Sequence, residues 1–290
     1  MIVGWGISMR QINQVRVFII AAMNIVGCLW GMLLYSDYDI QTYKKAVESA
    51  QKTLPVAYPI WAAVPWNENT VWDEDYQKIL AVTWIPAQYT QVYADKVGQD
   101  FETSKDFDMW VTLVPQVKNF CEDFGEKMGG VSCLAMKGRL SQFLGLPPLN
   151  YGPYPKTEYN GPFVEFWVDP QYLSRPCLTP DVASATCYWD SNISKYKNWD
   201  LDRMFRVAHV PAQHREWYKR NIEKAYPGMA WTRLGYTYDW GPSDEQHEGA
   251  TELIVQKGAP ITIKAVIPLE QYCPCVGVGG TKSVEGRGAG

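Results

Sequence analysis

Two acidic residues stand among aromatic residues in segments that resemble strands, and such a pair could carry hydrolytic chemistry. Glu165 shares a strand face with Phe163 and Trp167 in the segment FVEFWV, because side chains alternate along a strand. Asp239 lies in the aromatic segment LGYTYDW. If the two strands are neighbours, both carboxyl groups line one cleft beside aromatic rings, which is what glycoside hydrolysis requires. The competing interpretation is that Glu165 faces solvent or forms an ion pair with a nearby arginine.

The sequence carries no other recognisable catalytic motif. It has no G-x-S-x-G nucleophile elbow, no H-E-x-x-H metal motif and no C-x-x-C-H haem attachment sequence. Its three histidines are His209, His214 and His247, and His214 falls on the apolar face of a predicted helix, where a buried core histidine is expected. We therefore expect no metal and no cofactor. The lack of a motif favours a non-enzymatic function and leaves the enzyme question open.

Six of the seven cysteines lie outside the apolar N-terminal stretch and form three groups along the chain. They are Cys121, Cys133, Cys177, Cys187, Cys273 and Cys275. An even number of cysteines in an extracytoplasmic domain predicts disulfide bonds. Short loops close at the lowest entropic cost, so the favoured disulfides are Cys121–Cys133 and Cys177–Cys187. Many other pairings of the six cysteines stay open. A bond between Cys273 and Cys275 would be strained, because only one residue separates them.

The N-terminus carries the clearest signal for location. Residues 17–35 read VFIIAAMNIVGCLWGMLLY, a charge-free stretch close to the roughly 20 residues that a membrane-spanning helix needs. Arg10 and Arg16 precede it, and cationic flanks stay on the cytoplasmic side. This pattern predicts a cytoplasmic N-terminus over 1–16, a transmembrane signal anchor over 17–35 and a domain outside the cell membrane.

Two alternatives to a retained anchor stay open. The segment could be a cleaved secretory signal, or Cys28 could receive lipid, since IVGC resembles a bacterial lipobox. Within a retained helix, Gly27 and Gly31 form a G-x-x-x-G spacing, which allows close pairing with another membrane helix.

The remaining chain predicts one α+β domain with a mixed sheet and disulfides, over residues 55–275. A helical stalk over 36–54 should precede it, and a disordered tail over 276–290 should follow it. The expected helices are at 39–52, 117–128, 134–144 and 212–226, and the expected strands are at 79–85, 109–114, 163–168, 231–240, 251–256 and 261–267.

Composition narrows the functional classes. The chain has 290 residues, 47% of them hydrophobic and 14% aromatic, so it is not a disordered protein. Its net charge of −4 argues against nucleic-acid binding. We therefore expect a single-pass, membrane-anchored binding or assembly module in the periplasm or at the cell surface. Its partners would be the membrane and a protein of a membrane complex, contacted through the anchor helix and aromatic loops. The alternative is an anchored hydrolase, for example one acting on glycans, that uses Glu165 and Asp239.

Overall fold

The computed structural model describes residues 39–50, 60–148, 151, 160–187, 212–225, 228–241 and 247–276. The predicted anchor over 17–35, with Gly27, Cys28 and Gly31, and nearly all of the predicted tail lie outside these residues. Among the helices that the structure does describe, none combines the length and the apolar character needed to cross a membrane.

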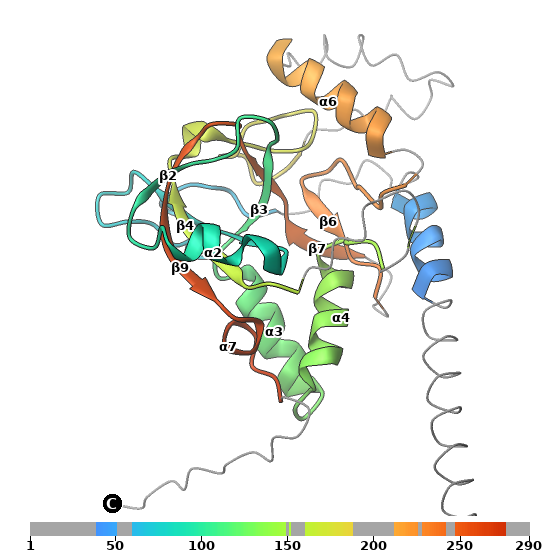
Figure 1. Ribbon diagram of the computed structural model, residues 1–290. Helices are drawn as coiled ribbons and strands as arrows, with labels where there is room; N and C mark the ends of the chain where they lie inside the picture. The colour runs from blue at the N-terminus through green and yellow to red at the C-terminus, as the bar shows by residue number, and fades with distance from the viewer. Residues whose placement is uncertain are drawn as a thin grey trace, which may run out of the picture.

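A seven-stranded sheet forms the centre of the domain, with the strand order β2-β9-β4-β1-β3-β8-β5 (Figure 1). All of its strand pairs are antiparallel. The strands are β1 (Ile79–Trp84), β2 (Asp100–Glu102), β3 (Met109–Leu113), β4 (Phe163–Val168), β5 (Leu173–Ser174), β8 (Leu253–Val255) and β9 (Pro260–Ile267). A separate two-stranded sheet pairs β6 (Tyr236–Tyr238) with β7 (Glu248–Thr251). The predicted α+β class is confirmed.

The two faces of the large sheet belong to two hydrophobic clusters. Along β1, Ile79 and Ala81 join one cluster, whereas Val82 and Trp84 join the other, as alternation along a strand requires. The second face is covered by α3 (Gln116–Lys127), α4 (Cys133–Phe143) and α7 (Leu269–Tyr272), which gather at one end of the molecule (Figure 1). Helix α6 (Ala212–Ala225) lies at the opposite end.

The helices predicted from apolar spacing are confirmed. Helix α4 begins where the Ser132 hydroxyl accepts a hydrogen bond from the backbone N–H of Ala135, which is an N-cap. After α3, Gly129 adopts a φ of +65°, which ends the helix without steric cost. The helix over residues 39–50 is also present, and its Tyr43 is fully buried against the domain beside Trp240. Its role as a stalk stays a prediction, but the described part is docked on the domain.

The strand predicted over 231–240 is too long. Only Tyr236–Tyr238 forms strand β6, because Arg233 and Gly235 both adopt positive φ angles of 62° and 77° and turn the chain. The strand predicted over 251–256 is divided in the same way, with Glu252 between the end of β7 and the start of β8.

Three disulfide bonds brace the domain, and one of the two preferred pairings is wrong. Cys177–Cys187 forms as predicted. Cys121 pairs with Cys273 and Cys133 with Cys275, so the predicted Cys121–Cys133 bond does not form. The reason is that the chain after α7 runs across both helices. There the Val276 N–H donates to the Val131 carbonyl, and the Cys133 N–H donates to the Val276 carbonyl.

Candidate functional site

Glu165 is buried in an ion-pair cluster. The residue is 2% exposed, and its Oε1 lies 2.5 Å from Lys118 Nζ, while Oε2 lies 3.5 Å from Lys264 Nζ. Lys118 also lies over the ring of Tyr272, 4.8 Å from its centroid. Burial and the neighbouring Glu165 carboxylate raise the pKa of the Tyr272 hydroxyl. This arrangement neutralises a carboxylate inside the helix-covered layer.

Asp239 belongs to a different ion pair, beside the two-stranded sheet. It follows β6, and the Arg139 guanidinium on α4 donates two hydrogen bonds to it, at 2.8 and 2.6 Å. The strand carrying Glu165, β4, has β1 and β9 as its neighbours, so the expectation that the two acids lie on adjacent strands is wrong. Two lysines pair with Glu165 and one arginine pairs with Asp239, and neither acid lines the cavity described next.

An aromatic cavity of about 520 Å³ lies between the large sheet and the β6–β7 pair. Strands β1 and β3 contribute one wall, and β7 with the chain before β6 contributes another. Its volume falls in the range typical of small-molecule sites. Seven aromatic side chains line it: Trp84, Tyr89, Tyr93, Phe107, Trp110, Phe163 and Trp231.

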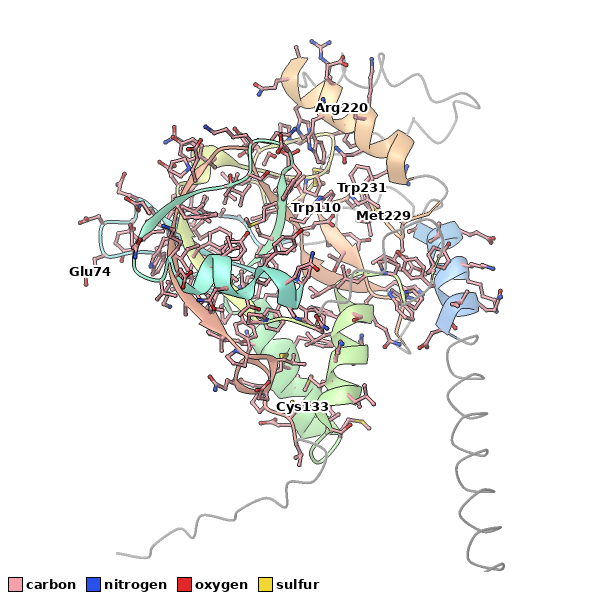
Figure 2. All side chains as sticks on the ribbon, viewed as in Figure 1. Glu74, Trp110, Cys133, Arg220, Met229 and Trp231 are labelled. Atoms are coloured by element: carbon pink, nitrogen blue, oxygen red, sulfur yellow. A yellow bond between two sulfur atoms is a disulfide. The ribbon has the colours of Figure 1, made fainter. Side chains whose placement is uncertain are left out.

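Three tryptophans form a cluster at one side of this cavity. The ring centroid of Trp110 lies 6.1 Å from Trp217 and 6.2 Å from Trp231, and Trp217 and Trp231 are 6.2 Å apart, edge to face. The Trp217 indole N–H donates to Asp108 at 2.9 Å, which fixes the ring. Figure 2 shows Trp110 and Trp231 close together beside Met229, all three of which line the cavity. Two of the three contacts, those of Trp231 with Trp110 and with Trp217, have the edge-to-face geometry that aromatic pairs favour.

Glu252 brings a carboxyl group to the cavity wall. Its backbone N–H donates a hydrogen bond to the Gly235 carbonyl, and its Oε2 is sealed from solvent near the Trp231 indole. Burial raises the pKa of Glu252 to about 8, and hydrogen bonding from the Trp231 indole N–H acts in the opposite direction. The Trp231 Nε1 is also sealed from solvent, and the Glu252 carboxyl is its polar neighbour. Glu252 is therefore largely protonated at neutral pH.

The other polar groups near this wall have protein partners. The Thr112 hydroxyl and the Thr251 N–H both donate to the Gln116 side-chain oxygen, at 3.1 and 2.8 Å. The Thr237 hydroxyl donates to the Phe143 carbonyl at 2.6 Å. Glu252 and Trp231 form a separate buried polar pair at this wall.

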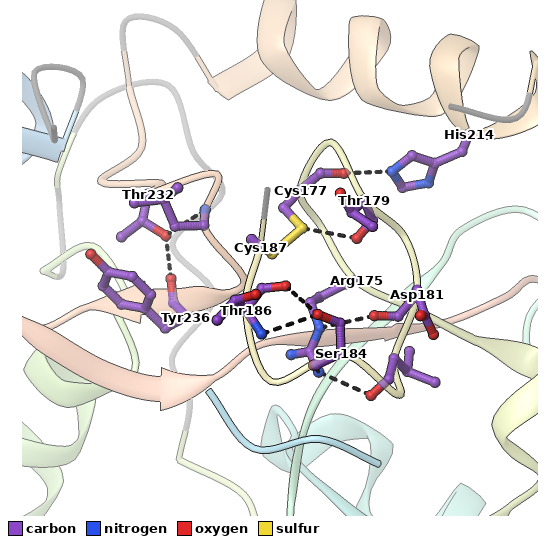
Figure 3. The surroundings of a disulfide bond; sticks show 12 residues. Arg175, Cys177, Thr179, Asp181, Ser184, Thr186, Cys187, His214, Thr232 and Tyr236 are labelled. Carbon is purple, nitrogen blue, oxygen red and sulfur yellow. Dashed lines mark hydrogen bonds between the residues drawn. A yellow bond between two sulfur atoms is a disulfide. The ribbon is translucent and has the colours of Figure 1, made fainter. Parts of the chain in front are cut away.

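A second polar cluster surrounds the Cys177–Cys187 disulfide and is structural (Figure 3). The buried Arg175 guanidinium donates to the carbonyls of Trp61, Val182 and Ser184 at 2.9–3.1 Å. Burial lowers the pKa of Arg175 to about 10, which still leaves it charged at neutral pH. Its donors hold the loop in place.

His214 belongs to the same cluster, and its predicted role as a buried core histidine is confirmed. Its Nε2 lies 2.7 Å from the Cys177 carbonyl, and its ring stacks on Trp217. Burial lowers the pKa of His214, so the imidazole is neutral and donates this hydrogen bond. The side chain ties α6 to the disulfide loop (Figure 3).

No protein-family model, curated protein or solved structure matches this chain.

The sequence reasoning missed Glu252 and the cavity. One signal was present, because Glu252 is the only charge in the run GATELIV, which otherwise fits a buried strand. The convergence of Trp110 and Trp231, from segments more than a hundred residues apart, had no local signal.

The raised pKa of Glu252 predicts a pH dependence of stability. The unfolded carboxyl ionises near 4.5 and the folded one near 8, so the unfolded state loses its proton first. We expect this contribution to the free energy of unfolding to be complete below pH 4.5 and to be lost as pH rises to about 8. Glu252→Gln stays neutral, so it should match the wild type at pH 4.5 and exceed it at pH 8.

Urea unfolding of the full-length protein at several pH values measures this difference. Glu122→Gln, at an exposed position of α3, is the matched control and should follow the wild type at every pH. Parallel pH profiles for the wild type and Glu252→Gln would contradict the assignment of a protonated Glu252.

Proposed function

We propose that this protein is a membrane-anchored, extracytoplasmic binding module that receives a small apolar ligand in its aromatic cavity. The observation that carries this proposal is the 520 Å³ space between the sheet and the β6–β7 pair, lined by seven aromatic side chains. Binding sites of this size are mostly apolar with a few placed polar groups, and this cavity has that character.

Exposed aromatic residues on the lining support access from outside. Phe107 is 63% exposed, Tyr89 45% and Trp110 38%, and all three line the cavity. Large apolar side chains gathered at the surface are typical of interaction sites. A ligand would therefore pass these rings on its way to Trp231 and Glu252.

The disulfides support the proposed location. Three bonds join all six cysteines outside the apolar N-terminal stretch. Disulfides persist in oxidising compartments, such as the periplasm or the cell surface. Together with the charge-free stretch over 17–35, they favour a domain displayed outside the cytoplasm.

The placement of the two acids favours binding over hydrolysis. Retaining and inverting glycosidases hold both carboxyl groups at one cleft. Here Glu165 is neutralised by Lys118 and Lys264, and Asp239 by Arg139, away from the cavity.

Ligand binding can be tested on the full-length protein in detergent by ¹⁹F NMR, with its 13 tryptophans labelled as 5-fluorotryptophan. Single Trp→Phe variants assign the signals. We expect 2-ethylnaphthalene to shift the Trp110 and Trp231 signals in a saturable manner. Trp66 is the internal control, because it is 81% exposed and does not line the cavity. No saturable shift, or an equal shift at Trp66, would refute the proposal.

A further inference from the structure

One acidic side chain on the cavity lining has no cation beside it among the described residues. Asp108 lines the cavity, and its Oδ2 accepts the hydrogen bond from the Trp217 indole. The described ion pairs of the domain engage Glu102, Glu165 and Asp239, and none of them includes Asp108. The half-buried Asp108 carboxylate therefore brings to the cavity a negative charge that no described cation pairs.

The rest of the described lining supplies no positive charge. It includes one other acid, Glu252, and no lysine, arginine or histidine. Glu252 is sealed from solvent next to the Trp231 indole, so Asp108 is the acid that a ligand can reach. An anionic ligand would meet a like charge at this wall, whereas a cationic ligand would be attracted to it.

Aromatic rings lie beside this carboxylate. The Trp217 indole that donates to Asp108 also packs against Trp110, with 6.1 Å between the ring centroids, so Asp108 and Trp110 meet the same side chain. Phe107 precedes Asp108 in the chain, lines the cavity as well and is largely exposed. The faces of such rings attract organic cations, and aromatic sites for quaternary ammonium groups use this attraction.

We infer that the cavity selects apolar ligands that carry an ammonium group, which lies beside the Asp108 carboxylate and the Trp110 ring while the apolar body fills the cavity. This inference rests on the proposed function, because it concerns the same cavity. A neutral ligand of the same shape would leave the Asp108 charge unpaired, and an anionic ligand would be repelled by it. The ligand class is therefore an apolar organic cation, such as an alkylammonium or arylalkylammonium compound.

Three ligands built on one naphthalene ring test the inference. Trimethyl(2-naphthylmethyl)ammonium carries the cation, 2-neopentylnaphthalene replaces its nitrogen with carbon and is neutral, and 2-naphthylacetate carries an anion. Dissociation constants come from the ¹⁹F signal of Trp110 in the full-length protein in an uncharged detergent. Free ligand concentrations are corrected for partition into protein-free micelles. We expect the cation to bind about tenfold more tightly than its neutral isostere, and the acetate to bind most weakly.

The Asp108→Asn variant shows whether the carboxylate causes this preference. Asparagine keeps an oxygen for the Trp217 indole N–H but carries no charge. The affinity ratio of cation to neutral isostere should therefore fall about fivefold, and the aromatic rings account for the remainder. Asp106→Asn is the matched control, because Asp106 is exposed two residues earlier and does not line the cavity. Its ratio should equal that of the wild type.

The outcomes separate this inference from the proposed function. If none of the three ligands shifts the Trp110 signal, the binding function itself fails. If the neutral isostere or the acetate binds as tightly as the cation, binding stands and the selectivity for ammonium groups is overturned. A ratio that survives in Asp108→Asn, or that falls equally in Asp106→Asn, overturns it as well, because the preference would then not depend on the carboxylate at the cavity.

Discussion

Loss of one of the two disulfides after α7 should lower the free energy of unfolding by about 3 kcal/mol, and loss of both by roughly 8 kcal/mol. Cys121–Cys273 and Cys133–Cys275 join residues 152 and 142 positions apart, so either bond alone closes one very large loop. In the presence of the first bond, the second closes only a ring of about 14 residues. Either bond alone therefore removes most of the unfolded-state entropy that the two bonds remove together. Loss of both removes a stabilisation comparable to the whole stability of a typical domain.

Paired serine substitutions test this non-additivity. Cys121→Ser with Cys273→Ser, Cys133→Ser with Cys275→Ser, and all four together should be compared by urea unfolding of the full-length protein. The control is Cys177→Ser with Cys187→Ser, which opens a bond of sequence separation 10 in another part of the domain. Its cost should simply add to that of either pair. If the four-serine variant loses only the sum of the two single-bond losses, the two bonds after α7 do not share one loop.

Breaking the buried ion pair of Asp239 should be nearly as damaging. Arg139→Met leaves the Asp239 carboxylate, whose side chain is 5% exposed, with the Gly241 N–H as its remaining described donor. Removing one partner of a buried pair costs about 3–5 kcal/mol, because the other charge stays desolvated. We expect Arg139→Met to show this loss in urea unfolding. The double variant Arg139→Met with Asp239→Asn should recover part of it.

An exposed pair provides the control. Lys105 lies 3.1 Å from Glu102, but the two side chains are 77% and 56% exposed. Lys105→Met should therefore cost less than about 1 kcal/mol. If Arg139→Met lowers the free energy of unfolding no more than Lys105→Met does, Arg139 does not stabilise the Asp239 carboxylate. Asp239 would then again be a candidate for a chemical role.

The local periodicity of apolar residues predicted the helices well. It carried no information on which cysteines far apart in the sequence form disulfides. Val117 and Cys121 face inward on α3 because the 3.6-residue repeat fixes which side is apolar. The disulfide partner of Cys121 depends instead on where the chain after α7 crosses the helix, which is a tertiary property. Loop length alone favoured Cys133, and the packing of α7 outweighed it.

The candidate site was even less accessible to sequence reasoning. Glu165 and Asp239 were singled out because aromatic residues flank them, but each has a basic partner from a distant helix. Glu252 was overlooked because it fell within the single strand predicted over 251–256, whereas the structure places it between β7 and β8. Only the positive φ angles near Gly235, which bring its carbonyl to the Glu252 N–H, place this carboxyl beside Trp231.

The order of the cysteines along the chain has a consequence for biosynthesis. Cys121 and Cys133 leave the ribosome well over a hundred residues before their partners Cys273 and Cys275. Strand β9 also comes late, and it must insert between β2 and β4. The domain therefore cannot close around its core before β9 and the two cysteines after α7 have been synthesised. Until then the two long-range disulfides cannot form, so the earlier part of the domain stays without these covalent restraints.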